Sequence, residues 1–510
     1  MANLTETTPN RKAGPSDEVL SGACLLVLLL AHILIWTLVA TIAQSSGALH
    51  HDMTEAYDWG REFQLGYHKH PPLFAWIAGV WFLVFPRADW AFYALSAVSA
   101  AGGLLGVWCI AGRLLPGRER TIALLLVMLT PLFNVMAMTF NGNAVLLLIW
   151  PWTLWAFIRS VQTGRTSDGL LFGVIAGLAL LSKYSSILLL ASCLAAALLH
   201  PRGRAYFASP APYAAIAACV LVCLPHAVWA LQHRLTTVTY VLEKPHLPLA
   251  SLVVKAASSL LGAMALYALP FAAIVGLVGW PKAREQLARC LATAGQRDQI
   301  WLTVLAVGPV LLTLGLGFAT GVKVSTNYLL PALFLMPIAA TVFGLPRAAG
   351  GSLSVLWRFL AGWFAVALLA APLAAILSFT SGTAQAVEPR REVAIEATRA
   401  WHEAFGRPLR FVAGSEAYGL GAPFYSPDAP ELFDILKPDT LPWASLEDVS
   451  REGLLIICLK TDAGCLERAK RLSSVGAQVR SLHLARSYLW WTAAGYDFQL
   501  IMLPPSTTRG

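Results

Sequence analysis

The stretch from His50 to Trp76 holds the residues of this chain that are best suited to chemistry. Apolar runs lie on both sides of it, so its ionisable groups would be held at a membrane surface, where they indicate chemistry on a lipid-borne substrate. An ordinary solvated loop between two spans is the alternative, since charged loops are common there. The groups are four of the eleven histidines, four carboxylates and two cations: His50, His51, His68, His70, Asp52, Glu55, Asp58, Glu62, Arg61 and Lys69.

A double proline, Pro71 and Pro72, ends this charged stretch. Proline fixes its backbone φ angle and therefore stiffens the chain where it turns into the next apolar segment. Lys69 and His70 would then be held at the boundary between water and lipid. The proline corner favours a functional role for the stretch over a solvated loop.

The composition is that of a polytopic membrane protein. Hydrophobic residues make up 57% of the 510 residues and charged residues only 13%, which leaves too little polar surface for a soluble globule of this size. The formal net charge of +9 comes from short basic clusters between apolar runs. That pattern is typical of the positive-inside rule, and no nucleic-acid partner is expected.

Hydropathy predicts about eleven membrane spans with a cytoplasmic N-terminus. This orientation places most Lys and Arg residues of the short loops inside, and the charged stretch outside. The segment 71–85 is apolar but shorter than the roughly twenty residues that a span needs, so we expect an interfacial or re-entrant helix there. The spans are expected near residues 20–43, 88–112, 120–140, 143–160, 168–182, 184–200, 210–231, 252–280, 299–319, 327–346 and 354–379.

The chain divides into three parts. Residues 1–19 are expected to be a disordered cytoplasmic tail, and residues 20–379 an all-α membrane domain with an outer loop at 44–87. Residues 380–510 are expected to form a small extracytoplasmic α/β domain. Its Cys458 and Cys465 would then face an oxidising compartment and could form a disulfide. The expected helices and strands are Glu392–Phe405, Leu409–Gly414, Leu454–Lys460, Ala463–Ser473, Val479–Leu484 and Phe498–Leu503.

Four motifs carry a resemblance to a known class of enzymes. They are TEAYDW (Thr54–Trp59), GYHKHPPLFAW (Gly66–Trp76), GLALLSKYS (Gly177–Ser185) and LPHAVWALQH (Leu224–His233). In order and spacing they resemble the GT-C glycosyltransferases, specifically the bacterial family-39 group. That group is related to the dolichyl-phosphate-mannose protein mannosyltransferases, the lipid A aminoarabinose transferase and the rhizobial lipopolysaccharide galacturonosyltransferases. The likeness covers roughly residues 20–345.

The resemblance implies that a sugar is transferred, with inversion, from a polyprenyl-phosphate-linked donor to an envelope acceptor: lipopolysaccharide, a glycolipid or a protein. It also implies that the reaction takes place on the periplasmic face of a bacterial inner membrane. The catalytic base is then expected among the acidic residues of the first outer loop. The chain departs from the family pattern at Thr54 and Asn143, where relatives commonly carry acidic residues. Asp52 and Glu55 remain as candidates for the base. A non-catalytic relative is an alternative.

A lipid phosphate leaving group needs preorganised cations and no general acid. We expect Arg61, Lys69, His70 and Lys183 to bind it. Lys183 interrupts two apolar runs, and an ammonium at membrane depth costs roughly 2.5–3.5 kcal/mol, which favours a functional role. The substrate cavity is further expected to include Tyr57, Tyr67, Asn143, Tyr184, His226, His233 and Lys323. For His226 and His233, ordinary packing at a helix end is the alternative.

The histidines of the charged stretch, His50, His51, His68 and His70, could hold a divalent metal together with Asp52. Their spacing matches no standard signature, so no metal ligand is assigned. Two other functions compete with glycosyl transfer. One is a transporter or flippase of lipid-linked sugars, which would need ionisable groups near the middle of the bilayer. The other is a non-catalytic envelope assembly protein.

Overall fold

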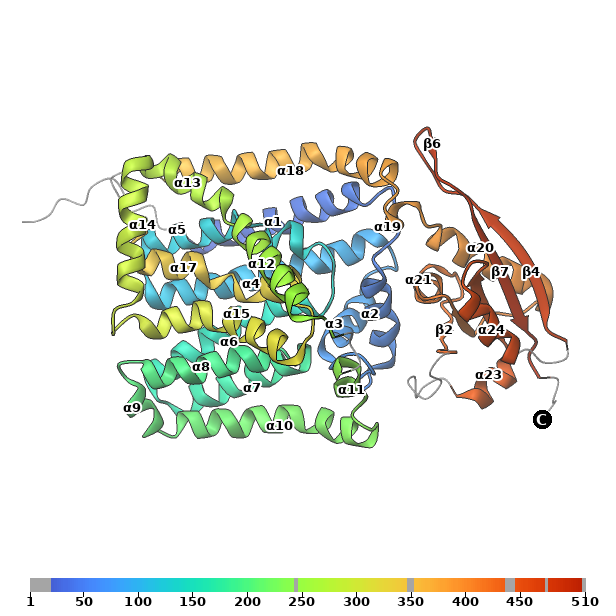
Figure 1. Ribbon diagram of the computed structural model, residues 1–510, viewed down its shortest axis with the longest axis horizontal. Coiled ribbons are helices and arrows are strands. Elements are labelled where there is room, and N and C mark those ends of the chain that lie inside the picture. Colours follow the sequence, from blue (N-terminus) through green and yellow to red (C-terminus); the bar gives the residue numbers. More distant parts are fainter. Residues whose placement is uncertain (1–19, 243–245, 346–352, 436–444, 473–475, 507–510) are drawn as a thin grey trace, which may run out of the picture.

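The computed structural model describes residues 20–242, 246–345, 353–435, 445–472 and 476–506. These residues form a bundle of helices with a small α/β domain at one end of it (Figure 1). The expected fold class, a helical membrane part followed by a C-terminal domain with a sheet, is confirmed at this level. The tail that the sequence predicts to be disordered, residues 1–19, lies outside the described residues.

Within the described residues, seven helical segments are long and apolar enough to cross a membrane. Backbone amides cannot bond to water inside a bilayer, so each apolar run satisfies its hydrogen bonds within its own helix. The segments are α1 (Gly22–Ala43), α4 (Asp89–Leu114), α6 (Gly142–Thr163), α10 (Ala211–Gln232), α12 with α13 (Leu249–Ala265 and Ala268–Val278), α15 (Ile300–Thr320) and α18 (Ser354–Thr380). The multi-pass prediction is confirmed.

The other predicted spans are short or broken. The helix α5 (Gly117–Met128) continues through η1 (Pro131–Phe133) and η2 (Val135–Ala137) with a bend of 65°. The helices α7 (Thr166–Ser182) and α8 (Ser186–Leu199) have 17 and 14 residues. The last predicted span before α18 is divided into α16 (Thr326–Leu329), η3 (Leu330–Ala332) and α17 (Leu335–Val342). Prolines at the starts of η1 and η3 account for two of these breaks. The count of eleven spans therefore stays a prediction.

Short helices gather at both ends of the bundle (Figure 1). At the end that carries the C-terminal domain lie α2 (His51–Glu62), α3 (Leu73–Phe82) and α11 (Thr236–Leu242). At the opposite end lie α9 (Gly203–Phe207) and α14 (Trp280–Ala294). The ten residues of α3 agree with the short helix expected in segment 71–85.

The first half of the charged stretch forms the helix α2, within the segment that the sequence predicted to be an outer loop. His50 caps this helix, because its Nδ1 accepts a hydrogen bond from the Asp52 amide. Asp52 in the first turn and Arg61 in the last turn complement the helix dipole. Gly60 of α2 and Gly79 of α3 bring the two backbones so close that a Cβ on either would collide with the other helix. The pair α2–α3 thus forms one tightly packed unit.

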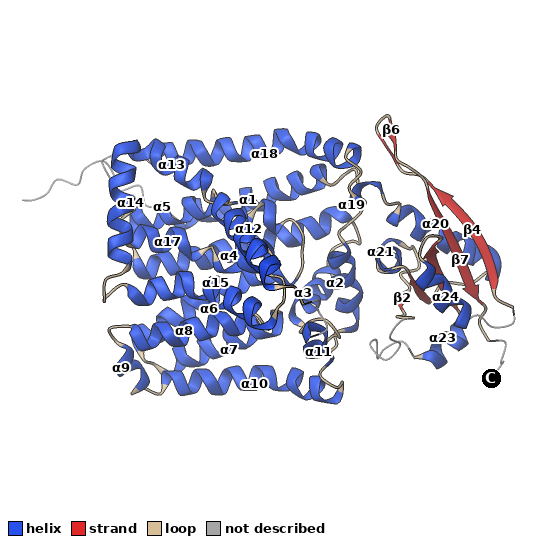
Figure 2. Ribbon diagram, in the orientation of Figure 1, coloured by secondary structure: helices blue, strands red, loops and turns tan. Residues whose placement is uncertain are grey.

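The C-terminal domain contains a five-stranded sheet of order β2-β1-β3-β7-β4 (Figure 2). Its strands are β1 (Phe411–Gly414), β2 (Glu431–Leu432), β3 (Leu454–Leu459), β4 (Gln478–Leu484) and β7 (Tyr496–Leu503). The pairs β1–β2 and β1–β3 are parallel, whereas β3–β7 and β4–β7 are antiparallel. The helices that the sequence predicted here are present as α20 (Arg390–Phe405) and α24 (Ala463–Leu472).

The central strand β3 is buried on both faces. Leu455 and Ile457 pack into a core with α20, and Ile456 and Cys458 pack into a second core with α24. Alternate residues of a strand point to opposite faces, which is why one apolar run serves both cores. The remaining helices of the domain are α19 (Ala384–Val387), α21 (Glu416–Gly419), α22 (Ala422–Tyr425) and α23 (Leu446–Glu452).

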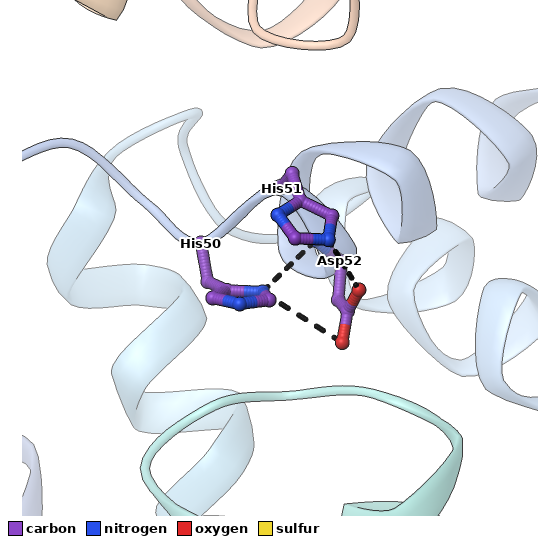
Figure 3. Close-up of side chains that lie close together, drawn as sticks. All are labelled: His50, His51 and Asp52. Carbon is purple, nitrogen blue, oxygen red and sulfur yellow. Dashed lines mark hydrogen bonds and ion pairs between the residues drawn. The ribbon is translucent and has the colours of Figure 1, made fainter. Parts of the chain in front are cut away.

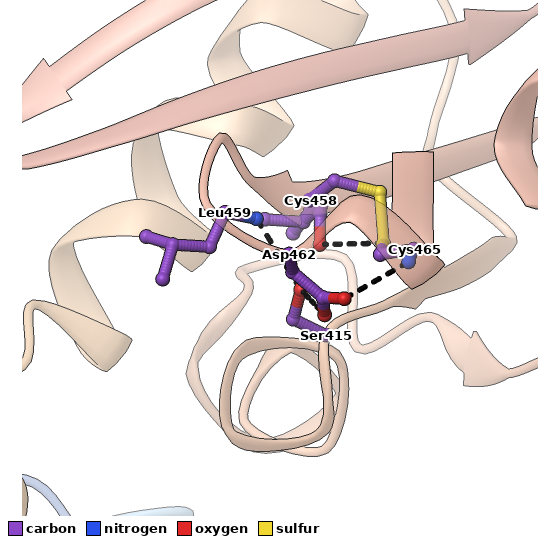
Figure 4. Close-up of a disulfide and its surroundings, with 6 residues drawn as sticks. Ser415, Cys458, Leu459, Asp462 and Cys465 are labelled. Atoms are coloured by element: carbon purple, nitrogen blue, oxygen red, sulfur yellow. Dashed lines mark hydrogen bonds between the residues drawn. A yellow bond between two sulfur atoms is a disulfide. The ribbon is translucent and has the colours of Figure 1, made fainter. Parts of the chain in front are cut away.

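A disulfide joins Cys458 of β3 to Cys465 of α24 (Figure 4). Asp462, in the turn between them, accepts a hydrogen bond from the Cys465 amide at 3.0 Å and another from the Ser415 hydroxyl at 2.7 Å. Ser415 follows β1, so the turn is tied to the neighbouring strand as well. The pairing that the sequence allowed is thus present in the structure.

Candidate active site

Asp52 and Glu55 lie one turn apart on the same face of α2. The Asp52 side chain keeps 33% of its surface exposed. Its Oδ2 accepts a hydrogen bond from the Asn141 amide at 3.0 Å, and its Oδ1 lies 3.2 Å from Nε2 of His51 (Figure 3). Burial alone would raise the pKa of Asp52, but the hydrogen bond from His51, the charges of His50 and His51, and Asn141 hold it well below its usual range. Asp52 is therefore an accessible carboxylate anion.

Glu55 is only 4% exposed. The Lys69 ammonium donates to its Oε1 at 2.7 Å. Burial raises the pKa of Glu55, and the charge and hydrogen bond of Lys69 oppose this rise. This ion pair holds the segment before the proline corner against α2.

A cavity of about 360 Å³ opens beside this corner. Five separate parts of the chain line it: the residues before and within the proline corner, the start of α6, the break between α7 and α8, α11 with His246 after it, and the region from α15 to α16. Its basic residues are Lys69, Lys183, Lys323, His70 and His246. The fold thus gathers basic side chains from distant segments around one space.

Lys183 stands at the break between α7 and α8, where its extended backbone ends α7. Its ammonium donates to Oδ1 of Asn143 at 2.6 Å and lies 4.9 Å from the centre of the Tyr328 ring. The amide of Asn143 orients the ammonium without neutralising its charge, at a position where the family resemblance implies an acidic residue. The lysine that interrupts two apolar runs in the sequence therefore marks a helix break at a cavity.

Tyr184 and His226 connect this break to α2. His226 Nδ1 lies 2.7 Å from the carbonyl oxygen of Leu65, so we assign the proton of the neutral ring to Nδ1. Nε2 then accepts from the Tyr184 hydroxyl at 2.7 Å, and Thr237 lies 2.8 Å from the same hydroxyl. Tyr184 lines the cavity, whereas His226 holds the segment after α2 against α10.

Two predicted cavity residues are placed in the aromatic packing around α2 instead. The Tyr57 ring packs edge-on against Phe82 and Phe424, each with centroids 5.2 Å apart. The Tyr67 ring stacks on Trp59 at 4.7 Å, and its hydroxyl donates to the Trp59 carbonyl. Neither tyrosine is among the residues that line the cavity, because large aromatic groups fill the core between α2, α3 and α22.

Arg61 and His233 also lie elsewhere. The Arg61 guanidinium donates to the carbonyl oxygens of Ala429 and Pro430 in the C-terminal domain, at 2.9 and 3.3 Å. The His233 ring stacks on Trp229 with centroids 4.2 Å apart, and its Nδ1 lies 2.8 Å from the Trp229 carbonyl. Arg61 therefore joins α2 to the C-terminal domain, and His233 has the helix-end role that the sequence offered as its alternative.

The C-terminal domain braces the segment around α2 through further contacts. The Tyr425 hydroxyl accepts a hydrogen bond from the Leu49 amide at 2.7 Å, and Arg87 donates to the Ser426 carbonyl at 3.0 Å. Asp58 of α2 is almost fully buried at this joint. Burial raises the pKa of Asp58 to about 7, although the charge of Arg61 opposes the rise.

Among the cavity residues that the sequence did not point to are Tyr240, His246 and Tyr328. His246 Nδ1 lies 2.8 Å from the Thr320 carbonyl, and the Tyr240 ring lies 6.5 Å from the His70 ring. A signal for the first two was present, because polar and aromatic residues concentrate in the connection between α10 and α12.

Among the described residues, His50, His51 and Asp52 form a group that could hold a metal ion, with ligand atoms within 4.8 Å of one another (Figure 3). His68 and His70 are not part of this group, and His70 lines the cavity. Nδ1 of His50 already accepts a hydrogen bond from the backbone amide of Asp52. A metal ion at His50 would therefore have to compete with the helix cap. A metal site stays a hypothesis.

The dolichyl-phosphate-mannose-protein mannosyltransferase family model matches residues 69–229, which include Lys69, Lys183 and His226. The crystal structure of ArnT from Cupriavidus metallidurans bound to undecaprenyl phosphate has a TM-score of 0.57 at 14% identity, and the match covers 94% of this chain and 98% of that one. The chain has the GT-C fold. The resemblance that the sequence motifs indicated is thereby confirmed.

Other comparisons with known proteins give lower TM-scores or no match. ArnT in the apo state has a TM-score of 0.54, with the same identity and coverage as the bound form. The oligosaccharyltransferase AglB from Archaeoglobus fulgidus has a TM-score of 0.42 at 11% identity, over 85% of this chain and 69% of that one. No curated protein sequence matches significantly.

Proposed function

We propose that this GT-C protein transfers a sugar from a polyprenyl-phosphate-linked donor to an envelope acceptor, with inversion at the anomeric carbon. The observation that carries the proposal is the cavity that brings Lys69, Lys183 and Lys323 together beside the carboxylates of α2. The match to ArnT bound to undecaprenyl phosphate supports a lipid-phosphate donor. The acceptor class is an envelope lipid, glycan or protein.

The donor's phosphate would lie among the lysines. A phosphate between helices is in a low-dielectric setting and needs cations that the fold already holds in place. A second cavity, of about 480 Å³ and lined by apolar side chains together with Tyr267, lies between α12, α13, α15 and α17. The helix α15 lines both, since Thr313 and Leu316 face the first cavity, and Leu311 and Leu314 face the second. The apolar chain of a polyprenyl phosphate would contact apolar side chains along α15.

Asp52 is the proposed base. In an inverting displacement the acceptor hydroxyl oxygen bonds to the anomeric carbon while the bond from that carbon to the phosphate oxygen breaks. The bonding pair stays on the phosphate, and the hydroxyl proton passes to Asp52. Asp52 is accessible, whereas Glu55 is buried against Lys69. Thr54 is buried and donates its hydroxyl to the His51 carbonyl, so it has a structural contact in place of the acid that relatives carry.

The proposed location is a bacterial inner membrane, with the site and the C-terminal domain on the periplasmic face. The proline corner before α3 and the helix α11, which line part of the cavity, lie at the end of the bundle that carries the C-terminal domain (Figure 1). The basic helices α9 and α14 lie at the other end, as expected for a cytoplasmic side. The disulfide of the C-terminal domain also supports this orientation, because disulfides persist in oxidising compartments.

The test is mass spectrometry of envelope glycolipids and surface polysaccharide from a strain that lacks this chain. One sugar should be missing, and it should return with the wild-type chain but not with the Asp52→Asn, Glu55→Gln double variant at equal expression. A complete set of sugars in the deletion strain would contradict the proposal. Restoration by the double variant would favour a flippase or an assembly protein over an enzyme.

A further inference from the structure

A small β-hairpin projects from the C-terminal domain. Its strands β5 (Ser487–Tyr488) and β6 (Trp491–Thr492) form a two-stranded sheet separate from the five-stranded one. The two residues of its turn, Leu489 and Trp490, are 60% and 76% exposed. Large apolar side chains are seldom so exposed in a turn, where polar residues and glycine predominate.

The backbone of this turn is strained. Leu489 has a φ of 54°, in the left-handed region that costs a branched L-residue free energy. Two-residue hairpin turns that need a positive φ at this position strongly prefer glycine or asparagine. Leucine thus occupies a position where glycine or asparagine would adopt the backbone conformation at a lower cost in free energy. This points to a role for the leucine side chain itself.

The base of the hairpin packs on the ends of two candidate membrane spans. Tyr488 and Trp491 contact the cluster around Phe379, in the last turn of α18, and the Phe379 and Tyr488 rings lie 5.8 Å apart. The Tyr488 hydroxyl lies 2.9 Å from the hydroxyl of Ser45, two residues after the end of α1. The hairpin is therefore held at the level where α1 and α18 leave the membrane.

The exposed apolar surface of those two helices leads to the hairpin. Residues spaced by four cover one face of each helix: Leu30, Leu34 and Leu38 on α1, and Leu369, Leu373 and Leu377 on α18. Exposed leucines in this arrangement are typical of a lipid-facing surface. In Figure 1 the tip beside the β6 label reaches past the end of α18 and away from the five-stranded sheet.

We propose that the hairpin tip, Leu489 and Trp490, binds the interfacial layer of the outer leaflet and anchors the C-terminal domain to the bilayer. Tryptophan and tyrosine favour this layer, because their rings are apolar and their polar atoms can reach water. Residues 487–493, SYLWWTA, carry no charge that would oppose burial among lipid headgroups. The anchor fixes the distance between the membrane surface and the domain that braces α2.

A protein partner is the competing occupant of this tip. The bilayer is favoured because the tip continues the lipid-facing surface of α1 and α18, and because it emerges beside their ends. An interaction with a soluble partner would not require that placement.

The test is spin-label accessibility in the full-length protein in phospholipid nanodiscs. The variants are Trp490→Cys and, as control, Val479→Cys on β4 of the same domain, where the side chain is 57% exposed. Both carry Cys24→Ser to remove an exposed cysteine. The label at 490 should be several-fold less accessible to a polar nickel chelate than the label at 479, and more accessible to oxygen. Equal accessibility to the nickel chelate at the two sites would overturn the proposal.

A photo-cross-linking residue at position 490 gives a second readout in cells. Cross-links to phospholipid are expected. Cross-links to another protein or to a second copy of this chain, with none to lipid, would refute the bilayer as partner. If the Trp490→Cys variant does not fold, the cross-linking variant alone decides the question, because an aromatic side chain is retained there.

Discussion

The Lys69 ammonium donates to Oε1 of Glu55 at 2.7 Å, so a cation beside the proline corner is tied to a carboxylate on α2. Asp52 lies one turn before Glu55, and Lys69 also lines the cavity. The carboxylates of Asp52 and Glu55 on α2 therefore have different environments. Glu55 is buried in an ion pair, and Asp52 keeps 33% of its side-chain surface exposed.

Substitution of the two carboxylates should separate these roles. Asp52→Asn should lower the transfer rate by about 10²–10⁴-fold with little change in donor affinity, the range for loss of a general base. Glu55→Gln should mainly weaken donor affinity, because it loosens Lys69. Transfer rates measured in detergent with a defined lipid donor would show this. Full activity in Asp52→Asn would end the assignment of the base.

The lysines of the cavity should govern donor binding. Lys69→Ala and Lys183→Ala should weaken binding of the polyprenyl-phosphate sugar, or slow its transfer, by roughly tenfold or more, the effect of losing one charged hydrogen bond of about 1.5–3 kcal/mol. Lys282→Ala, in α14 at the opposite end of the bundle, is the matched control and should behave as wild type. Unchanged rates and donor affinity in both cavity variants would argue against phosphate recognition there.

Asp58 should make stability fall as the pH rises. Its pKa is raised from 3.8 to about 7 in the folded protein, chiefly by burial, so the folded state holds a proton that the unfolded chain loses near pH 4. The free energy of unfolding should therefore decrease between about pH 4 and pH 7. In the Asp58→Asn variant the side chain at this position stays neutral at every pH. The melting temperature of this variant should be above that of wild type at pH 8 and close to it at pH 4.

Thermal unfolding in detergent at the two pH values tests this prediction for Asp58. The control is Glu467→Gln on α24, where the carboxylate is exposed at the surface. Parallel pH profiles for wild type and Asp58→Asn would show that the carboxyl at the joint does not titrate with folding.

The proposed orientation can be tested with reporter fusions after residues 165, 290 and 400. Alkaline phosphatase is active only outside the cytoplasm, so only the fusion after residue 400 should be active. The first two positions follow basic clusters at the end of the bundle opposite the cavity. Activity at 165 or 290 would contradict the orientation.

The class of protein, most long helices and the main strands of the C-terminal domain were predictable from the sequence alone. These features depend on local composition and periodicity, which a single segment carries. The sequence also singled out Lys69, His70 and Lys183 for phosphate binding, and Asn143, Tyr184 and Lys323 for the substrate cavity. All six line one cavity in the structure, and their roles stay predictions. The helical state of α2 was missed, because its charged residues obscured a helix that His50 caps and α3 supports.

The partner of each ionisable group depends on the packing of the folded chain. Lys183 and Asn143 are 40 positions apart, and Arg61 and Ala429 are 368 apart, yet both pairs are in hydrogen-bond contact. No local period encodes such pairs, because they depend on how spans pack against one another and where the C-terminal domain docks. For that reason the same role was expected for Arg61 and Lys69, whereas packing places Arg61 at the domain joint and Lys69 at the cavity.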